Sequence, residues 1–193
     1  RKAALKMRDI VRSTLGLRGV TFVYVGRLWH GKGLTFLLEA FHKLQMSSDK
    51  SVSLLLIGDG LEENKLRKIC REKEIKNVIF AGFIQKLELP TLYAVSDVFV
   101  FPTLGDPYGL AVDEAMACSL PVISSSSAGE IRKRVEDGLN GYIVPPGNSE
   151  ALFEKMKHLT YHSNLRLVMG SRSYNKVKGH TPERWAEDFE QAV

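Results

Sequence analysis

Two cations, Arg27 and Lys32, lie five residues apart in the glycine-rich segment GRLWHGKG at positions 26–33. Glycines such as Gly26 allow a ligand to approach the backbone closely. The segment lies between an expected strand and an expected helix, and a helix N-terminus adds free N–H groups and a positive dipole end. Together these features are typical of a phosphate-binding site. They also fit an ordinary glycine-rich turn with solvated Arg and Lys side chains.

Two acids lie eight residues apart in the segment DPYGLAVDEAMA, which begins at Asp106. Asp106 is expected in a loop, and Glu114 about two turns into the next helix. Because carboxylates accept hydrogen bonds from vicinal hydroxyls, one acid can hold a ribose and the other a hexose, while Gly109 and Leu110 offer N–H groups to a phosphate between them. Asp106 alone fits a turn residue before a proline. Glu114 would be costly in an apolar helix without a partner, whereas Asp113 is expected in solvent.

The elements that must position these residues are short apolar runs alternating with helical patterns. Continuous apolar strands separated by helices predict a mostly parallel sheet that is covered on both faces. With right-handed crossovers, this is an α/β, Rossmann-like doubly wound fold. Ligands of such folds bind beyond the carboxyl ends of the strands. Six strands are expected, at residues 21–25, 52–57, 78–81, 98–101, 121–124 and 142–144.

Helices are expected between these strands and after them. Leu34, Leu37, Leu38 and Phe41 recur at the spacing of one helix face. Asn148 or Ser149 can cap a helix by accepting a hydrogen bond from its free N–H groups. Further helices are expected around residues 89–95, 112–118, 128–136 and 165–177, and a last one is expected to begin at Thr181-Pro182.

Composition indicates a single globular domain spanning residues 1–193. Apolar residues make up 44% and charged residues 25%, as is usual for globular proteins, and no apolar run approaches the roughly 18 residues that cross a bilayer. The net charge of +5 suits anionic ligands, but no basic stripe with interleaved aromatic residues favours nucleic acid. No Cys/His cluster has metal-ligand spacing. Cys70 and Cys118 are expected as reduced thiols, which favours the cytoplasm.

The segment at positions 26–33 also nearly matches the P-loop pattern G-x-x-x-x-G-K-[ST]. Its eighth position is Gly33, however, which lacks the hydroxyl that would bind Mg²⁺. Asp59, after the second apolar run, is a candidate for the second metal-binding acid of such an enzyme. A P-loop-like NTPase or nucleotide-binding module is therefore an alternative hypothesis.

Several spaced motifs together resemble a known family. The segment GR-x₄-KG, the segment DPYGLxxxEAMA, the PVI at 121–123 and the pattern DGxxGxxVxP at 137–146 are similar to the C-terminal domain of glycosyltransferase family 4. Members are retaining enzymes of the GT-B fold, and the resemblance runs from about Thr21 to the end of the chain. It implies a domain that binds nucleotide sugars, without an obligatory metal. A nucleotide-sugar epimerase of the same fold is a further alternative.

The resemblance also implies a partner domain. Family members carry an N-terminal domain that binds the acceptor, and this sequence lacks it. Because the chain starts at Arg1 rather than Met, it is expected to be a piece of a longer protein. The isolated chain is therefore expected to transfer little sugar. The absent domain is a possible route to a membrane surface.

Roles for the candidate residues follow from the resemblance. Arg27 and Lys32 would contact the diphosphate of a UDP-, GDP- or ADP-sugar and stabilise the charge of the departing nucleotide. Asp106, at a position where the family usually has Glu, would contact the transferred sugar, and Glu114 would bind the ribose. The remaining donor contacts would come from Gly26, Gly109 and Leu110 near the phosphates and from Gly82, Phe83 and Ile84 against the base, with Leu87 packing nearby.

Overall fold

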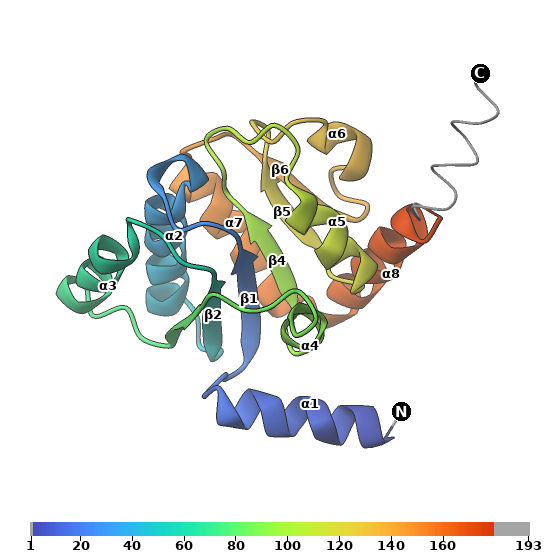
Figure 1. The fold of residues 1–193 in the computed structure, drawn as a ribbon, viewed down its shortest axis with the longest axis horizontal. Helices are drawn as coiled ribbons and strands as arrows, with labels where there is room; N and C mark the ends of the chain where they lie inside the picture. The colour runs from blue at the N-terminus through green and yellow to red at the C-terminus, as the bar shows by residue number, and fades with distance from the viewer. Residues whose placement is uncertain (1, 180–193) are drawn as a thin grey trace.

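The computed structural model describes residues 2–179 of the chain, and its centre is a six-stranded sheet (Figure 1). The strands are β1 (Val20–Val25), β2 (Val52–Ile57), β3 (Val78–Gly82), β4 (Val98–Phe101), β5 (Val122–Ser125) and β6 (Gly141–Val144). Their order is β3-β2-β1-β4-β5-β6 and every pairing is parallel. The predicted Rossmann-like, doubly wound sheet is confirmed. Its order reverses between the neighbours β1 and β4, where such folds bind ligands.

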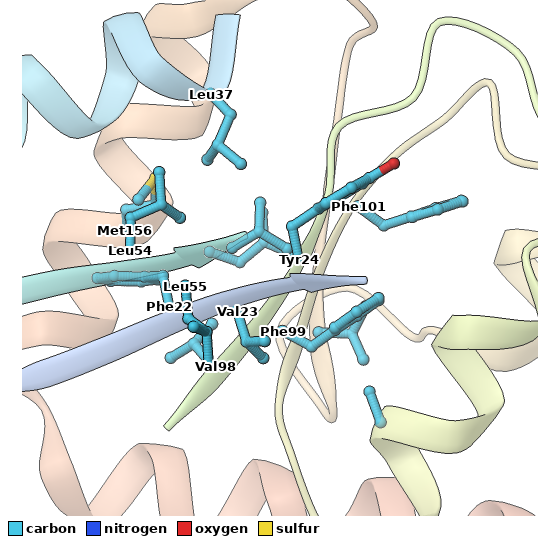
Figure 2. Close-up of a cluster of buried hydrophobic side chains, with 14 of the residues drawn as sticks. Phe22, Val23, Tyr24, Leu37, Leu54, Leu55, Val98, Phe99, Phe101 and Met156 are labelled. Atoms are coloured by element: carbon cyan, nitrogen blue, oxygen red, sulfur yellow. The ribbon is translucent and has the colours of Figure 1, made fainter. Parts of the chain in front are cut away.

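Helices cover both faces of the sheet. The helices of the described chain are α1 (Lys2–Thr14), α2 (Leu34–Ser47), α3 (Glu63–Glu72), α4 (Leu89–Ala94), α5 (Leu110–Ala117), α6 (Ile131–Arg134), α7 (Ser149–Tyr161) and α8 (Ser163–Val177), with a short 3₁₀ helix η1 (His30–Lys32). α2 packs against α7 on one face, and α5 packs against α8 on the other (Figures 1 and 2). No helix within residues 2–179 is both long and apolar enough to cross a membrane.

The core lies on both sides of the central strands because their side chains alternate between the two faces. Every residue of β1, β2 and β4 is buried, whereas the edge strand β3 is half-buried throughout. Figure 2 shows Leu37 of α2 and Met156 of α7 on one side of β1, with Val23 and Phe99 on the other. Buried strands with two apolar faces explain why the sequence shows continuous rather than alternating hydrophobic runs.

One helix is much shorter than the sequence pattern predicts. The pattern indicates residues 128–136, but α6 covers only Ile131–Arg134. Ala128 forms a β-bridge with Asp106, and Glu130 adopts a left-handed conformation with φ of 51°, so a helix cannot start before Ile131. The residues before α6 are thereby tied to the loop that follows β4.

The end of the chain shows how the sequence sets helix boundaries. Asn148, rather than Ser149, caps α7, because its Oδ1 accepts a hydrogen bond from the N–H of Ala151 at 2.9 Å. α8 ends at Val177 as expected. The predicted helix start at Thr181-Pro182 lies outside the described residues.

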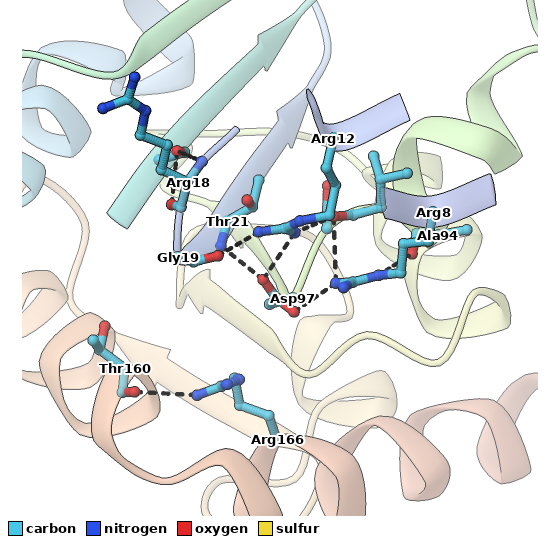
Figure 3. A network of polar contacts seen from close by, with 12 residues as sticks. Arg8, Arg12, Arg18, Gly19, Thr21, Ala94, Asp97, Thr160 and Arg166 are labelled. Atoms are coloured by element: carbon cyan, nitrogen blue, oxygen red, sulfur yellow. Dashed lines mark hydrogen bonds and ion pairs between the residues drawn. The ribbon is translucent and has the colours of Figure 1, made fainter. Parts of the chain in front are cut away.

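α1 is fastened to the amino ends of the strands by arginines. Figure 3 shows Arg8 and Arg12 reaching from α1 to Asp97, the residue that precedes β4. Arg8 Nη2 lies 2.8 Å from Asp97 Oδ1, and Asp97 Oδ2 also accepts the N–H of Thr21 at 2.8 Å. The helix is therefore held at the end of the sheet opposite the carboxyl ends of the strands.

We expect Gly33→Ala to destabilise the fold more than Gly16→Ala. Both glycines have a left-handed φ, 67° and 70°, so an added Cβ strains the backbone similarly at each. At Gly33 the Cβ would also overlap the carbonyl oxygen of Pro102, whereas at Gly16 no atom lies within 4 Å. The free energy of unfolding, measured with urea, should fall by at least about 1 kcal/mol more for Gly33→Ala. Equal losses would show that the loop after β1, which contains Gly33, does not pack closely against Pro102 in the loop after β4.

Candidate functional site

A cavity of about 350 Å³ opens at the point where the strand order reverses. It lies between the carboxyl ends of β1 and β4, and the start of α5 forms another wall. Of the residues singled out in the sequence, the cavity is lined by Gly26, Arg27, Lys32, Asp106, Gly109 and Leu110. The two cations and the amide-bearing turn therefore converge on one cavity.

The loop after β1 is shaped by a buried tyrosine. The hydroxyl of Tyr24 donates a hydrogen bond to the carbonyl oxygen of Arg27 at 2.9 Å. Burial, and secondarily the charge of Asp106, raises the pKa of Tyr24 far above its usual value, so the hydroxyl stays protonated. A Cβ on Gly26 would lie 2.8 Å from that hydroxyl oxygen. Gly26 is needed for this close approach, which fixes the backbone that carries Arg27.

Lys32 and Asp106 form an ion pair inside the cavity. Their side chains are only 16% and 13% exposed, and the pair joins the loop after β1 to the loop after β4. Asp106 Oδ1 also accepts the N–H of Tyr108 at 3.0 Å. Burial raises the pKa of Asp106, but the hydrogen bonds from Lys32 and from the Tyr108 and Gly109 backbone, together with the charge of Lys32, outweigh it, and the net pKa lies below the usual value. Asp106 is therefore ionised at neutral pH.

The turn into α5, at Gly109 and Leu110, lines the cavity. Gly109 has φ of 74°, and a Cβ there would lie 2.7 Å from the ring of Phe101. Leu110 is the first residue of α5, so its N–H has no partner within the helix. Free N–H groups and the positive end of the helix dipole favour an anion at this position.

Glu114 lies on the same face of α5 as Leu110, one turn further along, because residues four apart on a helix are neighbours. It is the fifth residue of α5 and so closer to the helix start than the sequence pattern indicated. Its Oε2 accepts a hydrogen bond from the hydroxyl of Tyr93 at 2.9 Å. Burial, followed by the charge of Glu114, raises the pKa of Tyr93, which keeps that donor protonated. Glu114 is not itself part of the cavity wall.

The residues expected against a base lie apart from this cavity. Gly82 ends β3, which is separated from β1 by β2. Phe83 and Leu87 are 66% and 93% exposed, whereas Ile84 packs partly against the core. None of these four residues is part of the cavity wall.

Two residues that the sequence patterns did not indicate lie outside the cavity wall and contact the site residues. Tyr93 is buried and holds Glu114, and Arg134 is buried at the end of α6. Arg134 forms an ion pair with Asp113 at 3.2 Å, so the expectation that Asp113 is merely solvated is wrong. The helical spacing of Arg134 from buried Ile131 was the available signal, because residues three apart share a face.

The structure gives the P-loop alternative little support. Gly33, which fills the position of the P-loop hydroxyl, is buried at the start of α2. Asp59 is exposed and does not line the cavity. Within the described part of the chain, no group of three or more His, Cys, Asp or Glu residues is placed to hold a metal ion.

Comparison with known proteins gives a consistent result. A family model described as "Glycosyl transferases group 1" matches residues 9–176. A sulfoquinovosyl transferase of Arabidopsis thaliana is 31% identical over 158 residues, which cover 81% of this chain and 29% of that protein. This chain spans 33% and 48% of two other curated relatives, an uncharacterized glycosyltransferase of Methanocaldococcus jannaschii and a spore coat protein of Bacillus subtilis.

Solved structures share the fold. The C-terminal domain of a glycosyl transferase group 1 family protein from Francisella tularensis has a TM-score of 0.79 at 24% identity, over 89% of this chain and 91% of that one. An Anabaena protein, HepE, solved in complex with UDP, has a TM-score of 0.84 at 23% identity, over 96% of this chain and 53% of that one. The doubly wound sheet described above therefore matches the Rossmann-like domains of GT-B glycosyltransferases.

Proposed function

The chain belongs to the glycosyl transferases group 1 family, and from this premise we propose that it binds the donor of a retaining hexosyltransferase. The donor is a nucleoside diphosphate sugar. One observation carries the proposal: Arg27, Lys32 and the turn at Gly109 and Leu110 line a single cavity at the switch point of the sheet. A guanidinium, an ammonium and a helix start each favour an anion, and residues that carry all three line this cavity.

In the proposed site, the diphosphate lies between the two cations and the start of α5. Arg27 offers a planar fork of donors that suits phosphate oxygens, and Lys32 adds a compact positive charge. As the bond to the sugar breaks, negative charge grows on the departing phosphate. Donors fixed in advance around that charge stabilise the transition state more than the ground state.

Asp106 and Glu114 would bind the two sugars of the donor. Asp106 lies inside the cavity beside Lys32, where it can accept hydrogen bonds from the transferred hexose. Glu114, held by Tyr93, has a second oxygen for the ribose hydroxyls. The base would lie against Gly82, Phe83 and Ile84, with the exposed Leu87 packing nearby.

This chain should bind the donor but transfer little of its sugar. Transfer needs the acceptor held next to the donor, and holding two substrates together supplies much of the rate. The chain spans less than half of the curated relatives it matches. We therefore propose that the acceptor site belongs to another domain of the full-length protein, and that the isolated chain binds donor but transfers little sugar.

A binding panel tests the proposed function. UDP, GDP and ADP, each with and without an attached hexose, are titrated against the chain by calorimetry. At least one of them should bind. No binding of any member would contradict the proposal. Mg²⁺-dependent hydrolysis of ATP or GTP that is lost in Lys32→Ala would favour an NTPase instead, and product analysis of the full-length protein would separate transfer from epimerisation.

We expect Asp106→Asn and Lys32→Met to change the affinity for a free nucleoside diphosphate in opposite directions. The negative charge of Asp106 pairs with Lys32 inside the cavity and so competes with a phosphate for that lysine. Its neutralisation should strengthen binding of the nucleoside diphosphate by up to about fivefold, which corresponds to about 1 kcal/mol. Lys32→Met should weaken binding. Asp59→Asn, a change at an exposed acid outside the cavity, serves as the control. A weaker affinity in Asp106→Asn would mean that Asp106 does not compete with the phosphates for Lys32.

A further inference from the structure

The guanidinium of Arg134 binds the backbone of the turn that opens α5. Nη1 donates to the carbonyl oxygen of Gly109 at 3.1 Å and lies 3.2 Å from Asp113 Oδ2. Nη2 donates to the carbonyl oxygen of Gly129 at 2.8 Å and to that of Tyr108. The guanidinium carbon also lies 4.4 Å from the centre of the Tyr108 ring. The side chain is only 8% exposed, so these contacts form in a largely dry environment.

The carbonyls that Arg134 holds determine where the neighbouring amides point. In a planar trans peptide, the C=O and N–H groups point in opposite directions. With the Tyr108 carbonyl turned toward Arg134, the N–H of Gly109 points away from it. The Gly109 carbonyl fixes the N–H of Leu110 in the same way. Gly109 and Leu110 both line the cavity that contains Arg27 and Lys32.

We propose that Arg134 is a positioning residue for the donor diphosphate, acting through the peptide groups of Gly109 and Leu110. The inference rests on the proposed function, since it requires a phosphate in the cavity. One planar fork of donors binds consecutive carbonyls in a fixed geometry, which the single ammonium of a lysine cannot reproduce. Asp113 pairs with Nη1 of the same guanidinium and balances the buried positive charge. Arg134 thus aims the amides at the phosphates without touching them.

Three variants test this role. Arg134→Met removes the fork, Arg134→Lys keeps only the charge, and Arg132→Met is a matched control because Arg132 is exposed on the same short helix. Each is titrated by NMR with the nucleoside diphosphate that binds the unaltered chain and with the corresponding phosphate-free nucleoside. Circular dichroism and a thermal melt establish whether each variant is folded.

In folded Arg134→Met, we expect the affinity for the diphosphate to fall at least tenfold while the affinity for the nucleoside stays within twofold. Arg134→Lys should lie between, and Arg132→Met should match the unaltered chain. An unchanged diphosphate affinity in Arg134→Met would overturn the positioning role and leave the proposed function standing. A parallel loss of both ligands would also overturn it, because general damage to the fold affects both.

If Arg134→Met does not fold, Arg134→Lys tests the positioning role. A folded Arg134→Lys that binds the diphosphate as tightly as the unaltered chain would overturn the positioning role. A selective loss of diphosphate affinity in that variant would support it. If the unaltered chain binds none of UDP, GDP and ADP, the proposed function fails and the role of Arg134 fails with it.

Discussion

Replacing Arg27 and Lys32 together with methionine is expected to lower the affinity for a nucleoside diphosphate at least hundredfold. Both side chains line the cavity, and each would form a charged hydrogen bond to the phosphates. A hydrogen bond to a charged group contributes about 1.5–3 kcal/mol, and each tenfold change in affinity corresponds to about 1.4 kcal/mol. In the full-length enzyme, the loss of transfer should exceed the loss of donor affinity, because the charge on the phosphate grows in the transition state.

Calorimetry with the chain measures the first effect, and initial rates with the full-length protein measure the second. The control is the pair Arg132→Met and Lys73→Met, which removes two exposed positive charges from outside the cavity. The control separates local contacts from the general attraction of a basic protein for anions, which salt screens. An equal loss in the control would show that net charge, rather than the cavity, binds the nucleotide.

Glu114→Ala is expected to weaken binding of a nucleoside diphosphate by about ten- to hundredfold, because a charged hydrogen-bonding group contributes about 1.5–3 kcal/mol. His30→Ala should have a much smaller effect, since His30 is exposed and packs edge-on against Trp29 rather than into the cavity. The ribose is the part of the ligand that Glu114 would contact. The unaltered chain should therefore prefer a ribonucleoside diphosphate over its 2′-deoxy analogue.

That preference gives Glu114→Ala a specific signature. In the variant, the ribonucleoside and 2′-deoxyribonucleoside diphosphates should bind with nearly equal affinity, because the acceptor of the missing hydroxyl is gone. Calorimetry with both ligands on both proteins completes the comparison. A preference for ribose that persists in Glu114→Ala, or equal affinities of Glu114→Ala and His30→Ala, would contradict the assignment.

The sheet and the convergence of the loops follow directly from the sequence pattern. Continuous apolar runs such as the one that forms β2 require cover on both faces, and alternation with helices requires parallel strands. Parallel strands place their following loops at one edge, so Arg27 and Asp106 were expected on the same side of the sheet. Sequence patterns also place Lys32 near them. The ion pair between Lys32 and Asp106 depends on side-chain geometry, which residue spacing does not predict.

The support behind the cavity was harder to predict for two physical reasons. Arg134 lies in the run Arg132-Lys133-Arg134, and three consecutive cations usually indicate a solvated surface. It is buried because backbone carbonyls from two loops accept hydrogen bonds from its Nη1 and Nη2, a tertiary contact without a local sequence signal. Glu130 shortens α6 through a left-handed backbone, which is uncommon for a residue other than glycine.

A crystal structure of this chain with the tightest-binding of UDP, GDP and ADP tests the proposed site most directly. We predict that a phosphate lies within about 3 Å of donors on Arg27, Lys32 and the Leu110 amide, with Lys32 turned away from Asp106. An ordered nucleotide whose phosphates lie outside this cavity, with the pair between Lys32 and Asp106 intact, would contradict the proposed donor site.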